Sequence, residues 1–588
     1  MYKSSTSCSN QGYALVNVLL MASISLVIMA ATIKRVNSNS NYNMRSEEYT
    51  TSLNAAEAAV EKAIARMSYD FDTYGPPGIN NNLAIYRSAI PNEHDYWSKF
   101  LFSDTHGNSN KISVTAQSSY SGPLPSQYPG LYTTKSPIYR VTAQAQHVAG
   151  RQVAAAVQAD VLLALVPITQ YAIFFNGLLE FSTCAAMTVN GRVHANGAIY
   201  TGTSASLTFN GTVTTTSTIS SPAWNGQGPT WTSKGTYKGS PQSRTNVPTV
   251  SLSIGNTNVN NLIDMPAVGE SPTSTAGIAR LYNQASTVIL VSNNIVKLVI
   301  QQAIHDQVPG ADPSPVIVTS SNTVTHLYTN FPFLTLSNSF TDQRESKTIR
   351  PVDIDIAKYA LWIKTNTSIL SKFPANSGTY PTILYVADNR TNSATQLSAV
   401  RILNGSTPPL NGGMGFSLAT PNPLYVKGHY NCTNATYLGT TNTVATVPCA
   451  FMSDALTILS SSWTDSASAG AYASRVAANT TVNAAILTGI VKSTGSTSTT
   501  FSGGIHNLPR LLEDWNGKTL TLNTSIMSLF NSTKATHQFI NPGTYYNPPT
   551  RQFSFDLNFY DPAKQPPGIP CALVLIRYNW TTPVATAL

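Results

Sequence analysis

One long apolar run lies near the start of the chain and passes into a second, amphipathic pattern. Residues 13–33 contain no charged side chain, and a helix of that length spans roughly 31 Å, close to the hydrocarbon thickness of a bilayer. Apolar side chains then recur at helical spacing between residues 42 and 67. The pattern predicts a single helix over 13–68, half in a membrane and half packed under a globular head. The side chains expected to anchor the packed half are Leu53, Val60, Ile64 and Met67.

The pattern changes after this helix. Residues 69–170 combine loops rich in Pro, Gly and Asn with two β-prone stretches between 138 and 166, which flank a turn at Ala149-Gly150. Alternation in the first stretch and a mostly apolar second stretch predict a hairpin. We expect this hairpin to pack against the helix and complete a small β-sheet module.

From residue 171 onward, short β-prone stretches are separated by Asn-Gly pairs. Asn176 and Asn196 are 20 residues apart, and so are Asn190 and Asn210. Asn and Gly accept the backbone conformations of sharp corners, and a short repeat of strands and tight turns is typical of a stacked β-solenoid. The spacing therefore predicts solenoid rungs over 171–223, with a Greek-key sandwich as the alternative.

The remaining chain divides by composition. Residues 224–379 predict an α/β insertion, and rung-like strands return over 380–530. The tail at 531–588 is rich in Pro and aromatic residues, and we expect it to cap the ladder because Pro lacks a backbone donor. The predicted fold is mainly β with α+β parts: a long helix, a small sheet module and a β-solenoid (parallel β-helix-like) head.

The N-terminal region has a family resemblance. A polar leader that ends at Gly12, the apolar run, and the segment SLNAAEAAVEKAIARM at 52–67 resemble type IV prepilins, and in particular minor pilins of the PilX type. The resemblance covers the first 70 residues or so. It implies cleavage after Gly12 by a prepilin peptidase, so that Tyr13 becomes the first residue. Glu usually occupies the fifth mature position in that family, and Asn17 stands there in this chain.

The resemblance also implies partners and a location. The helix would hold the subunit in the bacterial inner membrane, with its head periplasmic or on the cell surface, and would later pack with other pilins or pseudopilins. The helix positions singled out for membrane and filament contacts are Asn17, Leu20, Leu26 and Ile28. An ordinary signal anchor is the alternative. A cleaved secretory signal fits less well, because its apolar region usually has ~7–15 residues.

Composition narrows the class of protein. Charged residues make up 10% of the chain, against ~25% in an average soluble domain. The net charge of +9 arises from 35 basic and 26 acidic residues that are scattered along the sequence. Without a basic cluster between aromatic residues, nucleic acid is not an expected partner. This composition is typical of an extracytoplasmic β-rich protein.

The cysteines leave one question open. Cys432 and Cys449 flank a loop rich in Thr and Asn, and they form either a disulfide or two free thiols, depending on the redox compartment. No CxxC motif supplies further ligands. No metal or cofactor site is therefore expected.

Carboxylates were weighed as catalytic candidates, because a glycosidase needs two of them ~5–9.5 Å apart. The candidates are Asp388 with Arg390, Asp454, Asp465, and the pair Glu513-Asp514. They share no repeat register, and neighbours on a strand face opposite sides. Asp353 or Asp355 is expected to cap a helix, and His194 is expected to be a hydrogen-bonded rung residue. We therefore expect no catalytic residue and no enzyme activity.

Two functions remain. The first is a minor pilin-like or pseudopilin-like envelope protein that contributes to the assembly of a type IV pilus or type II secretion filament, as a tip or adhesive subunit. The alternative is a membrane-anchored β-helix enzyme that acts on polysaccharides. A groove lined by clustered carboxylates or aromatic residues would favour the enzyme.

Processing provides the first test. We expect cleavage between Gly12 and Tyr13, so intact-mass measurement of protein made with its native peptidase should show loss of residues 1–12. Gly12→Val should retain them. A mature chain that starts beyond residue 30 would instead identify an ordinary signal peptide.

Overall fold

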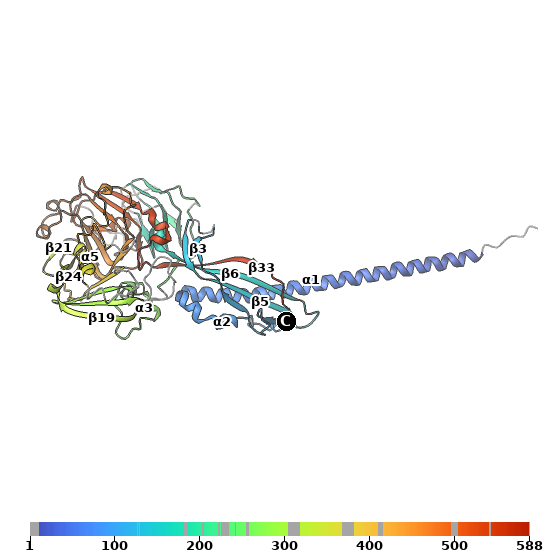
Figure 1. Cartoon of the computed structure of the whole chain (residues 1–588). Coiled ribbons are helices and arrows are strands. Elements are labelled where there is room, and N and C mark those ends of the chain that lie inside the picture. Colours follow the sequence, from blue (N-terminus) through green and yellow to red (C-terminus); the bar gives the residue numbers. More distant parts are fainter. Residues whose placement is uncertain are drawn as a thin grey trace, which may run out of the picture.

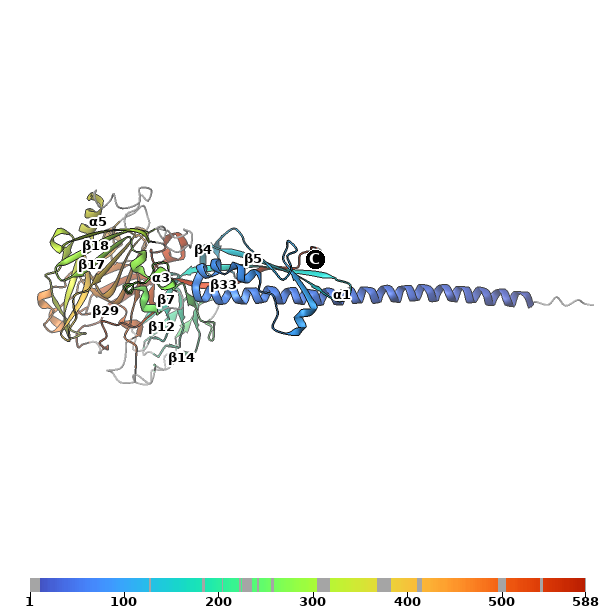
Figure 2. The same ribbon diagram turned by 90° about the horizontal axis from the view of Figure 1, so that it is seen from below.

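The chain forms an elongated molecule in which a bare helix projects from a β-rich body (Figure 1). The computed structural model describes residues 11–125, 128, 130–181, 186–202, 205–221, 224, 235–240, 243–254, 258–303, 318–366, 382–409, 415–494, 504–539 and 543–586. A small sheet lies along the far half of the helix, and the body lies beyond the end of the helix (Figures 1 and 2).

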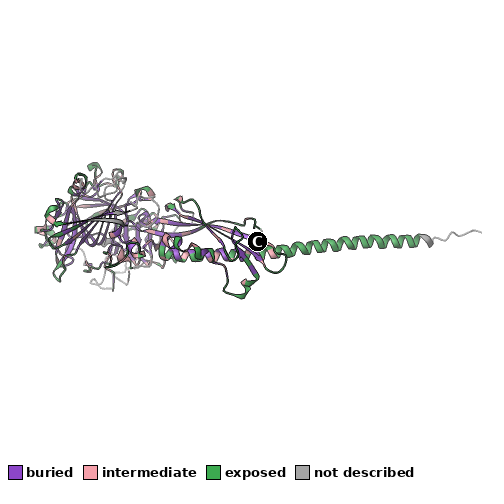
Figure 3. Ribbon diagram, turned by 60° about the horizontal axis from the view of Figure 1, so that its bottom comes forward, coloured by how far each residue is buried: buried purple, intermediate pink, exposed green. Residues whose placement is uncertain are grey.

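The predicted N-terminal helix is confirmed and extends farther than expected. Helix α1 covers Gln11–Asn81, with a kink at Gly75, where φ is 65°. That conformation costs little only for Gly, and Pro76 and Pro77 follow it. Helix α2 at Leu83–Arg87 completes this region. The first half of α1 is exposed, and burial begins where the sheet meets it (Figure 3).

The sheet beside α1 is antiparallel and has six strands. Its order is β1-β5-β6-β33-β16, and β2 also pairs with β5. The bounds are β1 Phe100–Ser103, β2 Ser113–Ala116, β5 Ile138–His147, β6 Ala154–Pro167, β16 Ser251–Leu252 and β33 Cys571–Thr581. The hairpin expected over 138–166 is β5 with β6, paired from Gln146↔Ala154 to Ile138↔Leu162. Two short strands, β3 at Tyr120–Pro123 and β4 at Tyr132–Ser136, pair separately.

The last strand corrects the expected terminal cap at 531–588. Strand β33 leaves the body and lies antiparallel to β6, with Cys571 opposite Pro167. Strand β32, at Thr550–Phe555, does extend a body ladder by pairing parallel to β30 at Thr519–Thr524. The Pro-rich stretch ends before β33, and the apolar residues that follow it are free to pair.

The first part of the body consists of three ladders of short parallel strands. They are β7-β10-β13, which is one end of a larger sheet, β8-β11-β14 and β9-β12-β15. Paired residues are 20 positions apart in most of these ladders, but Thr208 of β12 pairs with Thr236 of β15. In the first, Ile173 pairs with Val193 and Val193 with Val213. The bounds are β7 Tyr171–Phe175, β8 Leu179–Glu180, β9 Met187–Val189, β10 Arg192–Ala195, β11 Ile199–Tyr200, β12 Leu207–Phe209, β13 Val213–Thr215, β14 Ile219–Ser220 and β15 Thr236–Tyr237. Since β15 lies beyond residue 223, the expected boundary of these rungs is too early.

The second part of the body joins the first through β31, which pairs parallel to β7. From β31 the ladder continues in the order β28-β26-β25-β23-β17, with every pair parallel. The bounds are β17 Thr287–Ser292, β23 Ile383–Asp388, β25 Phe416–Lys427, β26 Cys449–Leu459, β28 Ala485–Thr488 and β31 Ile526–Ser528. Together with β7, β10 and β13 these strands belong to one sixteen-stranded sheet.

This sheet also corrects the α/β insertion expected at 224–379. Strand β17 pairs with β23, and β22 at Lys347–Asp355 pairs parallel to β24 at Gln396–Leu403. Strands β17 and β22, which lie within 224–379, therefore belong to the body's own sheet. Its edge is the antiparallel run β17, β18 at Ile295–Ala303 and β19 at Val318–Leu327. Helix α5 at Ile356–Thr365 follows Asp353 and Asp355, where a helix was expected to begin, and α3 at Thr275–Ala279 and α4 at Leu281–Gln284 are short.

The described residues thus show a long helix and a β-rich body of several sheets. Parallel pairing in the three ladders of short strands differs from the antiparallel pairing of a Greek-key sandwich.

Stacked corners fix the 20-residue register. The amide of Asn196 donates to Asn176 Oδ1 over 2.9 Å, and that of Asn210 donates to Asn190 Oδ1 over 2.6 Å. The glycines that follow stack as closely, because a Cβ at Gly211 would lie 2.0 Å from the carbonyl oxygen of Gly191. The Asn-Gly spacing in the sequence is therefore a record of direct contacts between successive repeats.

Substitution at these corners tests the stacking. Gly211→Ala should destabilise the body by several kcal/mol, because the new methyl group would overlap backbone that cannot move freely. Gly177→Ala is the matched control, since a Cβ there meets no atom within 4 Å. Thermal unfolding of the full chain in detergent measures both variants. Equal melting temperatures for the two would contradict the stacked arrangement.

Candidate membrane and assembly helix

The first half of α1 is an apolar helix without protein cover. Its eighteen-residue window of highest mean hydropathy scores 2.4, and none of that window is buried. Leu20, Leu26 and Ile28 are 55%, 66% and 60% exposed, and Asn17 is also exposed. By length and composition this helix is able to cross a membrane.

Two hydroxyls within the apolar run are satisfied inside the helix. The hydroxyl of Ser23 donates to the Leu20 carbonyl over 2.8 Å, and that of Thr32 donates to the Ile28 carbonyl over 2.7 Å. Such bonds to the preceding turn lower the cost of placing these two donors in hydrocarbon.

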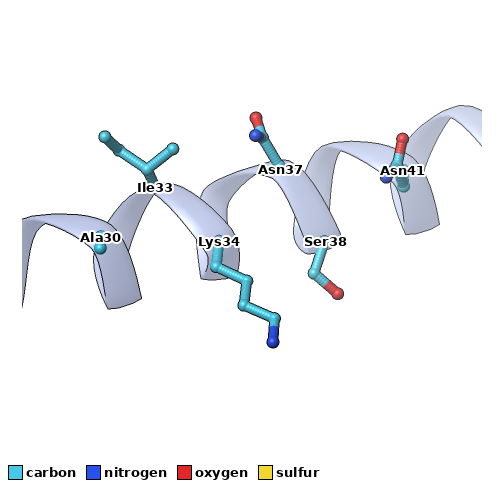
Figure 4. A pocket seen from close by; sticks show the side chains of 6 residues that line it. All are labelled: Ala30, Ile33, Lys34, Asn37, Ser38 and Asn41. Carbon is cyan, nitrogen blue, oxygen red and sulfur yellow. The ribbon is translucent and has the colours of Figure 1, made fainter. Parts of the chain in front are cut away.

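The apolar run gives way to polar side chains over three helical turns. A shallow hollow in the surface marks this change, and Figure 4 shows its six lining residues: Ala30, Ile33, Lys34, Asn37, Ser38 and Asn41. All six belong to α1, so no second element closes the hollow. We regard it as the boundary of the apolar segment and not as a ligand site.

The second half of α1 is held by the sheet. Val60, Ile64 and Met67 are buried at 2% exposure or less, and Leu53 is half-buried at the margin of the same cluster. Their partners on β5 and β6 include Val141, Val157 and Val161. The hydroxyl of Ser52 also donates to the Val153 carbonyl over 2.8 Å. Burial of this face is the main contribution that holds helix and sheet together.

The turn between β5 and β6 is hydrogen-bonded to α1 at the point where the exposed half of the helix begins. The Arg151 backbone N–H donates to both carboxylate oxygens of Glu48, over 3.1 and 3.0 Å. The Arg151 guanidinium donates to the Asn41 carbonyl over 3.3 Å. These bonds set the point at which α1 leaves the sheet.

The expected cleavage site lies at the start of the described chain. Helix α1 begins at Gln11, so Gly12 and Tyr13 fall in its first turn, and residues 1–10 lie outside the described part. Cleavage after Gly12 stays a prediction.

The candidate carboxylates are each engaged by partners close at hand. Asp388 pairs with Arg390 over 2.8 Å, and Asp465 pairs with Arg401 over 2.6 Å. Asp454 accepts from the backbone N–H groups of residues 533, 534 and 535, and so orders that loop. Asp514 accepts from the Asn547 amide over 2.9 Å. Asp465 shares its partner Arg401 with Asp353, whereas Asp388, Asp454 and Asp514 bind other groups.

Glu513 has the feature most typical of a general acid. Burial raises its pKa to about 7, and the side chain is fully buried. Its two oxygens accept from the backbone N–H and the hydroxyl of Ser460, each over 2.6 Å. A carboxyl closed off in this way, within the described residues, lacks access to a substrate.

Two other expectations concern helix capping and a rung histidine. Asp355 caps α5 by accepting from the Lys358 N–H over 3.0 Å, whereas Asp353 instead binds Arg401. The His194 ring contacts Thr214 Oγ1 over 2.9 Å and Asn196 Oδ1 over 3.0 Å, and burial lowers its pKa. His194 thus occupies a hydrogen-bonded position between successive repeats.

Cys432 and Cys449 are both free thiols in the structure. Cys432 donates to the Tyr430 carbonyl over 3.2 Å, and Cys449 is part of the apolar core of the body. Burial raises the pKa of each thiol to about 12, so neither is readily ionised near neutral pH.

Sequence reasoning missed the buried ion pairs of the body. Arg401 binds both Asp353 and Asp465, and Arg510 binds Glu345 over 2.7 Å. The partners are far apart in sequence and share no spacing. Only the strand pairing brings them together.

Comparisons of the chain with family models, with curated proteins and with solved structures give no match. The function is therefore inferred from the geometry of the helix and the body.

The buried carboxyl gives a pH prediction. The folded chain holds the Glu513 proton between pH 4.5 and about 7, whereas the unfolded chain releases it, so this group lowers stability as pH rises across that window. Glu513→Gln should remove this dependence and be more stable at pH 7 by up to about 3 kcal/mol.

Ser460→Ala is the matched comparison. Its hydroxyl favours the ionised Glu513, so its loss should extend the fall in stability to higher pH. Melting temperatures of the three full-length chains at pH 4.5 to 8 measure both effects. A constant difference between wild type and Glu513→Gln across this range would contradict the assignment.

Proposed function

We propose that the chain is a minor pilin-like or pseudopilin-like subunit, anchored in the inner membrane, that contributes to assembly of a type IV pilus or type II secretion filament. One observation carries the proposal: a single helix has one half packed on its own sheet and the other half apolar and uncovered. A helix of this kind is able to reside in lipid and later exchange lipid contacts for contacts with similar helices. The partners of this proposal are other pilins or pseudopilins and a prepilin peptidase.

The body suits a terminal position in such a filament. It lies beyond the end of α1, roughly along the direction of the helix (Figures 1 and 2). A subunit added above this one would meet the body. We therefore place the chain at the tip or in the initiating complex, with the body outside the membrane and available for adhesion.

We further propose that the body is a parallel β-solenoid in two parts, the first at residues 171–237 and the second at residues 287–555. Support comes from the parallel 20-residue register of the first part and from asparagine contacts in both parts. In the second part, the Asn523 amide donates to Asn483 Oδ1 over 2.8 Å. Stacked amides of this kind stabilise successive rungs by satisfying each other's polar groups.

The enzyme alternative lacks a supporting observation. The carboxylates considered for it bind neighbouring backbone or basic side chains, and Glu513 is enclosed. We therefore propose a structural and adhesive role without catalysis.

Deletion and complementation test the proposal. Cells that lack the chain should form fewer filaments, or filaments with reduced attachment, and the wild-type chain should restore them. Leu20→Lys should fail to restore them, because a charge in the middle of the apolar run opposes both insertion and helix packing. Asn37→Lys, in the polar turns after the run, is the control and should complement.

The outcome that contradicts the proposal is equally specific. Normal filament number, secretion and attachment in the deletion strain would exclude an assembly or adhesive role. Full complementation by Leu20→Lys would show that the apolar run has no membrane or filament function.

A further inference from the structure

The whole body is inserted between two neighbouring strands of the small sheet. The chain leaves the sheet at the end of β6 and returns at the start of β33, and Pro167 and Cys571 are Cα partners. Two covalent connections between the sheet and the body thus lie side by side at this point. Within the described residues, the chain also enters the sheet at β16, which contributes only Ser251 and Leu252.

These two connections have a mechanical direction. The β5–β6 turn grips α1 at Glu48, near the projecting half, and the far end of β6 faces the body. Strand β33 runs back along β6 toward that turn, and the end of the chain lies where α1 emerges (Figure 1). A pull on the body against the anchored helix therefore draws β6 and β33 in the same direction, because both strands join the body at the same end. The load falls on the hydrogen bonds that join β6 to β5 and on the contacts of β33 with α1. The hydrogen bonds between β6 and β5 lie perpendicular to the strands and are therefore loaded in shear.

Side chains on both faces of the sheet hold β33 against this slide. On one side, Asp160 of β6 binds the Arg140 guanidinium of β5 over 2.8 and 3.0 Å and accepts from the Asn579 amide of β33 over 2.7 Å. The Asp160 residue is only 4% exposed. On the helix side, Arg577 of β33 forms an ion pair with Glu61 of α1.

The sequence of β33 provides both apolar packing and polar contacts. Ala572, Leu573 and Ile576 are buried against the sheet and the helix, whereas the strand beyond residue 576 is exposed and depends on the polar contacts. Beyond Tyr578 the pairing with β6 shifts register. The regular ladder ends there, where Asn579 reaches Asp160.

We propose that β33 acts as a clasp, by which we mean a strand that transmits tension between the body and the anchored helix together with β5 and β6. Asp160 bridges the three strands at the end of the clasp, and the Glu61–Arg577 ion pair ties it to α1. The role of the clasp rests on the proposed anchoring, because tension arises only if the helix is held while the body is pulled. The clasp itself is a property of the folded chain and is testable without a filament.

Single-molecule force spectroscopy tests the clasp. The full chain, with its apolar helix in a detergent micelle, is held through a tag before α1 and through a second tag inserted beside Val444, which is 74% exposed in the body. We expect the first rupture to be separation of β6, together with β33, from β5 and α1, since β6 lies between the two tags. Asp160→Asn and Arg577→Gln should each shift this rupture to lower force.

A covalent variant keeps the test informative if the weakened chains fold poorly. Leu163 and Leu575 are Cα partners in β6 and β33, so Leu163→Cys with Leu575→Cys should form a cross-strand disulfide. The first rupture should then move to higher force and return on reduction. Asp388→Asn, which removes an ion pair within the body, is the control and should leave the first rupture unchanged.

Contradictory results are clear in both directions. A first rupture at the same force in Asp160→Asn, Arg577→Gln and the oxidised cysteine variant would show that β33 bears no load. Such a result would leave the filament assays unaffected, whereas normal filaments in the deletion strain would leave the rupture forces unaffected. The two proposals therefore fail independently.

Discussion

The need to shield the apolar side chains of both halves of α1 from water is the constraint on which the rest of the structure depends. Each large apolar side chain left in water forgoes roughly 1.5–3 kcal/mol of burial free energy. The sheet supplies this cover for the second half, through side chains such as Val60 and Ile64. The first half is covered by nothing else in the described chain. Under the proposed function, a bilayer or a bundle of similar helices would supply this cover.

Local patterns in the sequence predicted the parts of the fold that depend on contacts between residues close in sequence. The uncharged run and the helical spacing after it correspond to α1, and the stretches around Ala149-Gly150 correspond to the hairpin of β5 and β6. The Asn-Gly spacing corresponds to the 20-residue register, because identical corners stack on each other. In each case the residues that carry the signal are also those that make the contacts.

Contacts between distant segments left no such signal. Nothing in the spacing of Pro167 and Cys571 indicates that they are partners, nor does the sequence around β17 indicate that it pairs with β23. The Pro-rich tail masked β33, and the basic partners of Asp353 and Glu345 came from other strands. The candidate carboxylates were therefore recognised as residues without a shared register, but their partners were not foreseen. Backbone pairing over long sequence separations depends on the global topology.

The junction of β7 with β31 has a consequence for how such a body changes in evolution. The chain enters the ladder at β7, which has only β10 and β13 on one side and the longer run from β31 to β19 on the other. The end of the ladder at β19 is therefore the one remote from the attachment point. Repeats gained or lost at that end would alter the length and the outer surface of the body without disturbing its mounting. The anchor and the exterior are thus free to diversify at different rates.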